Sequence, residues 1–164
     1  MKILVLSDSH GNLDNMVRAV ETVQPRLIIH LGDCWGDALR LQKRFPNIPM
    51  EQVPGNCDRY RVPPHVSEIL ITRVFGVDFY MTHGHKHRVK STMGLLTAAA
   101  RVARVQAVLY GHTHIPDCRK EGDLWILNPG SSGSWGGSAG IIEVEDGKIL
   151  SCRNYRYGDQ EELK

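Results

Sequence analysis

One stretch decides the fold: Lys2-Ile3-Leu4-Val5-Leu6-Ser7-Asp8-Ser9-His10-Gly11. The continuous apolar run over residues 3–6 predicts a buried strand, and the polar run over residues 7–11 predicts the loop after it. Beyond this loop, apolar residues recur at the spacing of one helix face. They are Leu13, Met16, Val17 and Val20. The chain therefore opens with a strand, a loop and a helix.

The same pattern is repeated once. Residues 27–31 predict a second buried strand, residues 32–36 a polar loop, and residues 38–45 a short helix that Pro46 ends. Strands that are apolar throughout, without alternation, indicate a sheet covered on both faces. In such α/β units the loops at the carboxyl ends of the strands are where ligands bind.

The second half of the chain predicts shorter elements. Two strands, over 67–73 and 77–82, flank Phe75-Gly76, and an amphipathic helix over 90–104 leads to a buried strand over 107–110. An antiparallel series should follow, with Asp146-Gly147 as a hairpin turn. Its strands are 124–127, 140–144 and 148–153, and residues 130–140 form a glycine-rich loop near the site. We expect residues 1–164 to form one mixed α/β domain.

Composition excludes several functional classes. The 20 Lys and Arg residues nearly balance the 18 Asp and Glu residues, so a net charge of +2 gives no sign of a nucleic-acid or membrane-surface partner. The four cysteines form no CxxC pair, and Asp8 and His10 end the first apolar run too early for a signal peptide. The longest later apolar stretch, 95–110, is shorter than the roughly 20 residues of a membrane span. We expect a cytoplasmic protein with reduced thiols and no membrane segment.

Five polar clusters carry the candidate chemistry, each after a predicted strand or in a turn with glycine. They are Asp8-Ser9-His10, Gly32-Asp33, Gly55-Asn56-Cys57-Asp58, His83-Gly84-His85 and Gly111-His112-Thr113-His114. Imidazole, carboxylate and amide groups together suit Mn, Fe, Zn, Co or Ni better than Mg or Ca. On an extended segment, His112 and His114 would point the same way and share one cavity. The glycines allow sharp turns and the close approach of an anion such as phosphate.

Other polar and aromatic residues fit structural roles. His30 lies inside an apolar strand and His65 follows two prolines, so neither is a predicted ligand. Cys34 reads as a small buried hydrophobe rather than a thiolate ligand. Trp35 and Trp135 can line a pocket or simply pack in a core or a turn.

Taken in order, the five clusters resemble those of the calcineurin-like metallophosphoesterase superfamily. Gly55-Asn56-Cys57-Asp58 and the later Asn128-Pro129-Gly130-Ser131 are similar to the compact bacterial and archaeal phosphodiesterases of the YfcE and MJ0936 type. The resemblance implies two packed mixed β-sheets flanked by helices, a four-layer α/β/β/α sandwich. It also implies a ligand set: Asp8, His10 and His114 for one ion, Asn56, His83 and His112 for the other, and Asp33 as the bridge.

The implied reaction is hydrolysis of a small phosphodiester by two divalent ions, with Mn²⁺ favoured and Ni²⁺, Zn²⁺, Fe²⁺ or Co²⁺ as alternatives. Two ions about 3.5 to 4 Å apart can generate a metal-bound hydroxide as nucleophile and clamp the phosphoryl oxygens. Many superfamily members carry a His, paired with the following acid, where this chain has Cys57. A thiol is a weaker hydrogen-bond donor, so we expect substrates with good leaving groups, such as aryl esters. The predicted catalytic residues are Asp33, Asn56, Cys57, Asp58 and His85; His85 and His87 are candidates for the missing acid.

Three alternatives stay open at this stage. A Vps29-like scaffold would use the same fold without catalysis, since fold alone does not decide function. A phosphomonoesterase would keep the metals, and a nuclease is disfavoured by the missing basic surface. Homo-oligomers occur among the proteins that the chain resembles, although the sequence identifies no interface.

Overall fold

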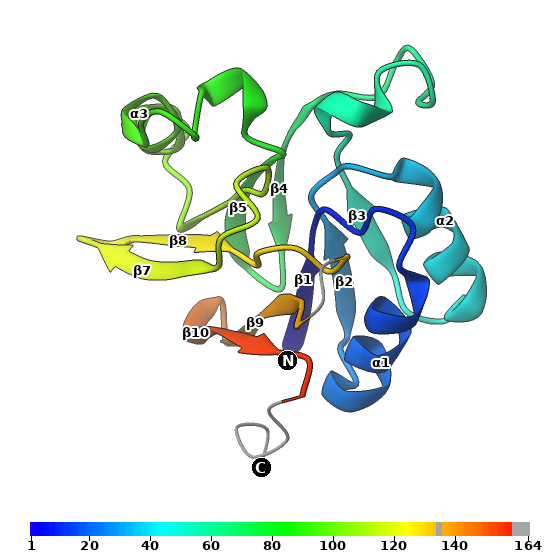
Figure 1. Cartoon of the computed structure of the whole chain (residues 1–164). Helices are drawn as coiled ribbons and strands as arrows, with labels where there is room; N and C mark the ends of the chain where they lie inside the picture. The colour runs from blue at the N-terminus through cyan, green and yellow to red at the C-terminus, as the bar shows by residue number, and fades with distance from the viewer. Residues whose placement is uncertain (134–135, 159–164) are drawn as a thin grey trace.

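The computed structural model describes residues 1–133 and 136–158 (Figure 1). Trp135 and the last six residues of the predicted domain lie outside this described part. Two five-stranded sheets make up the centre of the fold. The first sheet has the strand order β10 (Lys148–Arg156), β9 (Ser138–Glu145), β1 (Lys2–Leu6), β2 (Leu27–His30), β3 (Met50–Gln52). The second has the order β4 (Ile69–Val74), β5 (Val77–Thr82), β6 (Ala107–Leu109), β8 (Leu124–Asn128), β7 (Asp117–Glu121).

Both sheets are mixed. In the first, β1 pairs in parallel with β2, as Ile3 lies opposite Leu27, and antiparallel with β9. In the second, β6 runs parallel to both β5 and β8, while the edge strands β4 and β7 are antiparallel to their neighbours. These pairings confirm the predicted mixed sheets.

The fold has four layers, and an apolar cluster lies between each layer and the next. Residues from both sheets form the central cluster, for example Ile3, Phe79 and Leu109, all fully buried. The outer face of the first sheet packs on α1 (Leu13–Val23) and α2 (Trp35–Arg44), and the outer face of the second packs on α3 (Gly94–Val102). Figure 1 shows α1 and α2 on one side of the molecule and α3 on the other. This confirms the predicted α/β/β/α sandwich.

The helix bounds differ from the prediction. α2 begins at Trp35, three residues early, because Asp58 Oδ1 accepts a hydrogen bond at 2.7 Å from the Trp35 amide and caps the first turn. α3 is shorter than the predicted 90–104: turns occupy residues 88–91, and left-handed backbone at Arg104 (φ 55°) follows its last turn. None of the helices in residues 1–133 and 136–158 is both long and apolar enough to cross a bilayer.

The predicted antiparallel series is only partly correct. β9 and β10 form the expected hairpin around the turn at Asp146-Gly147. β8, in contrast, belongs to the other sheet and runs parallel to β6. Two strands went unpredicted, the short β3 and the polar β7.

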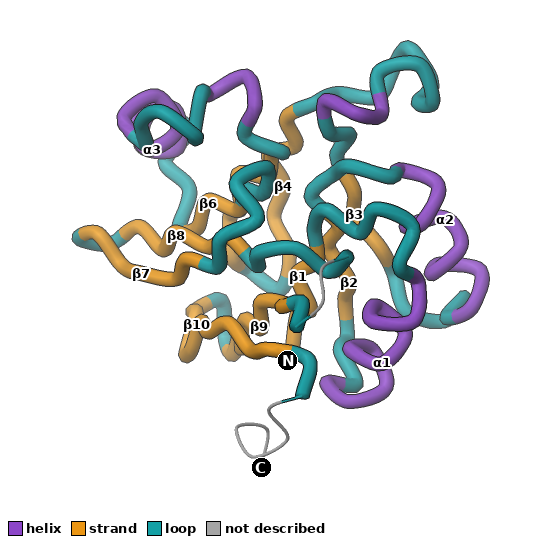
Figure 2. Tube along the Cα trace, viewed as in Figure 1, coloured by secondary structure: helices purple, strands orange, loops and turns teal. Residues whose placement is uncertain are grey.

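The parallel strands place the five polar clusters at one end of the sandwich. Asp8, Asp33 and Asn56 follow β1, β2 and β3, whereas His83 and His112 follow β5 and β6. Backbone hydrogen bonds join neighbouring loops within each sheet: Asp8 N donates to Gly32 O at 2.9 Å in the first sheet, and Gly111 N donates to His83 O at 3.0 Å in the second. The loops are drawn in teal in Figure 2.

Candidate metal centre

Strained backbone is concentrated at the predicted ligands. Five of them have positive φ angles: Asp8 at 53°, His10 at 44°, Asp33 at 58°, His112 at 69° and His114 at 61°. A non-glycine residue rarely adopts this left-handed conformation, which costs on the order of 1–3 kcal/mol and clusters at functional sites. The extended segment predicted for residues 112–114 is therefore wrong, since the chain turns sharply at both histidines.

The Asp8 carboxylate lies at the centre of the site and is fully buried. Its Oδ2 accepts hydrogen bonds from Ser7 Oγ at 2.5 Å and from the His112 amide at 3.1 Å. Its Oδ1 has no hydrogen-bond partner in the described residues, although three imidazole Nε2 atoms approach it. These are His114 at 3.0 Å, His10 at 3.9 Å and His83 at 3.9 Å. Since a buried carboxylate oxygen needs compensation, this atom fits a cation held between it and the imidazoles.

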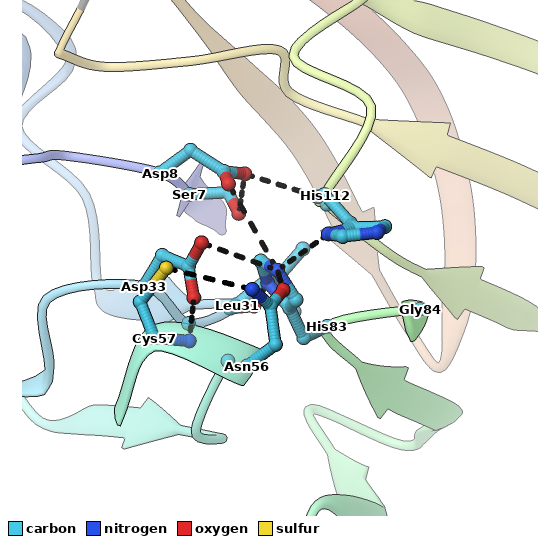
Figure 3. A network of polar contacts seen from close by, with 12 residues as sticks. Ser7, Asp8, Leu31, Asp33, Asn56, Cys57, His83, Gly84 and His112 are labelled. Carbon is cyan, nitrogen blue, oxygen red and sulfur yellow. Dashed lines mark hydrogen bonds and ion pairs between the residues drawn. The ribbon is translucent and has the colours of Figure 1, made fainter. Parts of the chain in front are cut away.

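His83 presents a lone pair to the same space. Its Nδ1 lies 2.8 Å from the Leu31 carbonyl oxygen, which can only accept, so Nδ1 carries the proton. In the neutral ring Nε2 is then an acceptor. Nε2 nevertheless faces Asn56 Oδ1 at 3.2 Å and Asp33 Oδ2 at 3.6 Å, two further acceptors (Figure 3). An acceptor nitrogen that faces two oxygen acceptors fits a metal ion, and the Nδ1 contact is the outer-shell bond that orients a ligating histidine.

All seven predicted ligands meet at this point. Two triads bring their ligand atoms within 4.8 Å of one another: Asp8 with His10 and His114, and Asp8 with Asp33 and His83. His112 Nδ1 adds to the second triad, 3.2 Å from His83 Nε2. Asp8 is thus the carboxylate common to both triads. The predicted division of ligands, with Asp33 as the bridge, remains a prediction.

Asp33 and Cys57 are neighbours in the site. The Cys57 amide donates to Asp33 Oδ1 at 2.9 Å. Burial alone would raise the pKa of Asp33, but His83 and this amide outweigh it, so the pKa lies below its ordinary value. For Cys57, loss of solvent around the sulfur and the nearby Asp33 carboxylate raise the pKa of the exposed thiol to about 11. The thiol therefore keeps its proton at neutral pH and is a poor acid.

The structure separates the remaining catalytic candidates. Asp58 is buried below the loop, where Oδ2 accepts from the Gly55 amide at 2.8 Å in addition to the cap on α2, so its geometry suits positioning. His85 lies beside the cluster, its ring centroid 5.5 Å from that of His83, and burial followed by His83 lowers its pKa. His87 instead points into the fold, with Nε2 2.9 Å from the Tyr80 hydroxyl.

Sequence reasoning missed the buried residues that hold the loops. Asp37 is one: its Oδ2 accepts hydrogen bonds from Ser9 Oγ at 2.9 Å and from the Gly11 amide at 2.7 Å. An acid in the first turn of α2 gives only a weak signal for this role. The sequence marks Asn128 only as part of the motif Asn128-Pro129-Gly130-Ser131, without this role; its Nδ2 donates to Gly111 O at 3.0 Å and to Thr113 Oγ1 at 2.9 Å.

We expect Asn128→Ala to lower Mn²⁺ affinity about 10- to 100-fold, as loss of an outer-shell partner does. The substitution frees the loop that carries His112 and His114 and leaves the Gly130 amide, which donates to Asn128 Oδ1 at 2.9 Å, without its acceptor. Calorimetric titration measures the affinity, and Asn47→Ala at an exposed turn is the matched control. Unchanged affinity beside a lowered Tm would mean that Asn128 serves stability alone.

Two hollows flank the cluster. One, of about 490 Å³, is lined by His10, Asn12 and Arg40, and the other, of about 530 Å³, by Lys90, Thr113 and others. The first is lined by a predicted ligand, His10, and the second by Thr113, which lies between two others. Carboxylate, amide and imidazole groups that converge at the carboxyl ends of parallel strands are the donor set of a metal-dependent hydrolase.

Comparison with known proteins agrees with this class. A model of the calcineurin-like phosphoesterase superfamily domain matches residues 1–147, so the chain belongs to that superfamily. The family and the enzyme class predicted from the sequence are thereby confirmed.

Two proteins of similar sequence are named as phosphoesterases, and one solved structure illustrates the similarity of the fold. The chain is 30% identical over 138 residues to the probable metallophosphoesterase YsnB of Bacillus subtilis, covering 80% of this chain and 75% of that protein. It is 27% identical over 146 residues to phosphodiesterase MJ0936 of Methanocaldococcus jannaschii, covering 79% and 83%. The fold resembles Vps29 complexed with Zn²⁺ from Entamoeba histolytica, with a TM-score of 0.74 and 17% identity over 96% of this chain and 98% of that one.

Proposed function

We propose that the chain hydrolyses small phosphodiesters with two divalent ions, Mn²⁺ being the favoured metal. One observation carries the proposal: among the described residues, the buried Asp8 Oδ1 has no hydrogen-bond partner, and it faces three imidazole nitrogens. A single buried ion pair would account for one of these contacts, not three. The mixture of nitrogen and oxygen donors supports Mn²⁺ or a later transition metal over Mg²⁺.

In this proposal His10 and His114 complete one ion site with Asp8, and Asn56, His83 and His112 complete the other, with Asp33 between them. Bound ions would polarise the phosphoryl oxygens and lower the pKa of a shared water. The chain's own residues position this chemistry. Leu31 O fixes the His83 tautomer, Ser7 and the His112 amide hold Asp8, and the Cys57 amide orients Asp33.

A diester substrate with a good leaving group follows from Cys57. A thiol with a pKa near 11 gives a proton to a departing alkoxide poorly, and His85, whose pKa is lowered, is neutral near pH 7. Leaving groups that depart without a proton are then favoured. The name of the MJ0936 relative supports a diester over a monoester.

We predict that Cys57→His raises kcat on an alkyl phosphodiester by about 10²-fold relative to an aryl one, because an imidazole can act as the missing general acid. The exposed position of Cys57 leaves room for the larger ring. A leaving-group series in the variant, the wild type and Cys57→Ser measures the effect. A ratio of alkyl to aryl rates that does not change in the histidine variant would contradict it.

One assay distinguishes the proposed phosphodiesterase from a non-catalytic scaffold and from a phosphomonoesterase. The purified chain, after chelation and return of Mn²⁺, is given an aryl phosphodiester and an aryl phosphomonoester with the same leaving group. We expect Mn²⁺-dependent hydrolysis, faster for the diester. No hydrolysis with any divalent ion would support a binding protein, and a faster monoester would support a phosphatase.

A further inference from the structure

Two thiols meet where the edges of the two sheets come together. Cys118 lies on β7, the edge strand of the second sheet, and Cys152 lies on β10, the edge strand of the first. Their Sγ atoms are 2.9 Å apart, although 34 positions separate them in the chain. Both are half-buried and pack against the central apolar cluster between the sheets. The hydrolytic site uses neither of them.

The spacing favours a covalent bond over two separate thiols. A thiol is a weak hydrogen-bond donor and acceptor, so an S–H···S contact contributes little stability. A disulfide bond is about 2.05 Å long, which leaves less than about 1 Å of closure. β7 and β10 are edge strands, so each is hydrogen-bonded to a neighbouring strand on one side only. A shift of this size therefore disturbs fewer hydrogen bonds than it would in a central strand.

The two sulfurs also differ in reactivity. Cys118 is the better nucleophile, because its thiolate can accept a hydrogen bond from Cys152, which lowers the pKa of Cys118. The same contact, followed by burial, raises the pKa of Cys152. In thiol exchange, the group with the larger thiolate fraction attacks first and its neighbour resolves the intermediate.

We propose that Cys118 and Cys152 form a reversible disulfide that joins the two sheets, produced by exchange with a low-molecular-weight disulfide. The Cys118 thiolate attacks one sulfur of that disulfide, whose S–S bond breaks and releases one thiolate. Cys152 then loses its proton and attacks Cys118 Sγ, and the second small thiolate leaves. The protein loses two electrons and two protons, and the small disulfide is reduced to two thiols.

The bond would restrain the strand next to the metal loop. Cys118 is four residues beyond His114, and Asp117 accepts a hydrogen bond from the Tyr110 hydroxyl at 2.8 Å. Asp117 also pairs in the sheet with Asn128, which holds the same loop. Closing a loop of this length should raise Tm by about 10 °C, through loss of entropy in the unfolded chain.

Peptide mapping tests the proposal on the full chain. The reduced protein is incubated with oxidised glutathione, alkylated and digested with trypsin. We expect peptides 105–119 and 149–153 joined and lighter by two hydrogen atoms, with separation by dithiothreitol and a Tm about 10 °C higher in the oxidised protein. Cys34→Ser, the matched control, should keep the link, whereas Cys152→Ser should leave Cys118 as a mixed disulfide with glutathione.

Two results would overturn the proposal. One is recovery of both peptides unlinked, whether alkylated or each joined to glutathione. The other is a linked pair without any rise in Tm, because a disulfide that joins the two sheets is expected to stabilise the fold. Because the experiment follows thiols and not hydrolysis, its outcome is independent of the proposed phosphodiesterase activity.

Discussion

Asp8→Asn should lower kcat/KM for an aryl phosphodiester by about 10³-fold. Bound metal ions stabilise the charge of the transition state by several kcal/mol, which corresponds to a rate effect of this size. The amide keeps the size of the side chain but removes the charge of the carboxylate that both ligand triads share. Mn²⁺ should consequently no longer raise the Tm of the variant. Steady-state kinetics and thermal melts with and without Mn²⁺ measure both effects.

Asp123→Asn is the matched control for this substitution. Asp123 is exposed in the turn between β7 and β8, and the same loss of charge there should change neither kinetics nor the Mn²⁺ effect on Tm. If Asp8→Asn retained wild-type kcat/KM, Asp8 could not be the metal ligand that we propose.

Gly111→Ala is expected to cost about 10²-fold in kcat/KM, the effect of displacing a reacting group by about 1 Å. A Cβ at Gly111 would overlap Ser7 Oγ and stand 2.9 Å from Asp8 Oδ2. The added methyl group must therefore move the hydrogen bond that orients Asp8. Kinetics together with Mn²⁺ titration would show the displacement as a loss of both rate and affinity.

Gly94→Ala provides the comparison for that variant. Its added Cβ would only reach Thr92 Oγ1 at 3.5 Å, an ordinary contact far from the ligands in sequence. Equal kinetic losses in the two glycine variants would point to a general effect on folding, and a fully active Gly111→Ala would show that close packing on Asp8 is not required.

The ligands were predictable because strand ends are visible in the sequence. The apolar runs before Asp8, Asp33 and His83 mark buried strands, and parallel strands bring their carboxyl ends together. Backbone conformation was harder to foresee. His112 and His114 turn in left-handed conformation, which nothing in the alternation of side chains reveals.

Missed strands have a physical reason. β7, Asp-Cys-Arg-Lys-Glu, is an edge strand, and charged side chains are how an edge avoids further pairing, so it lacks apolar alternation. β3 has three residues, all half-buried, too few to show a period. β8 and β9 are consecutive yet lie in different sheets, since strand order in space is not written in local pattern. The contact of Cys118 with Cys152 depends on that same order.

The most direct test of the metal centre is titration of the metal-free protein with Mn²⁺, following heat and diester hydrolysis in the same samples. Two ions should bind per chain, with activity rising as they do, and Asp8→Asn should show neither. Hydrolysis that persists at full rate in the metal-free protein, or a wild-type chain that binds no Mn²⁺, would contradict the account.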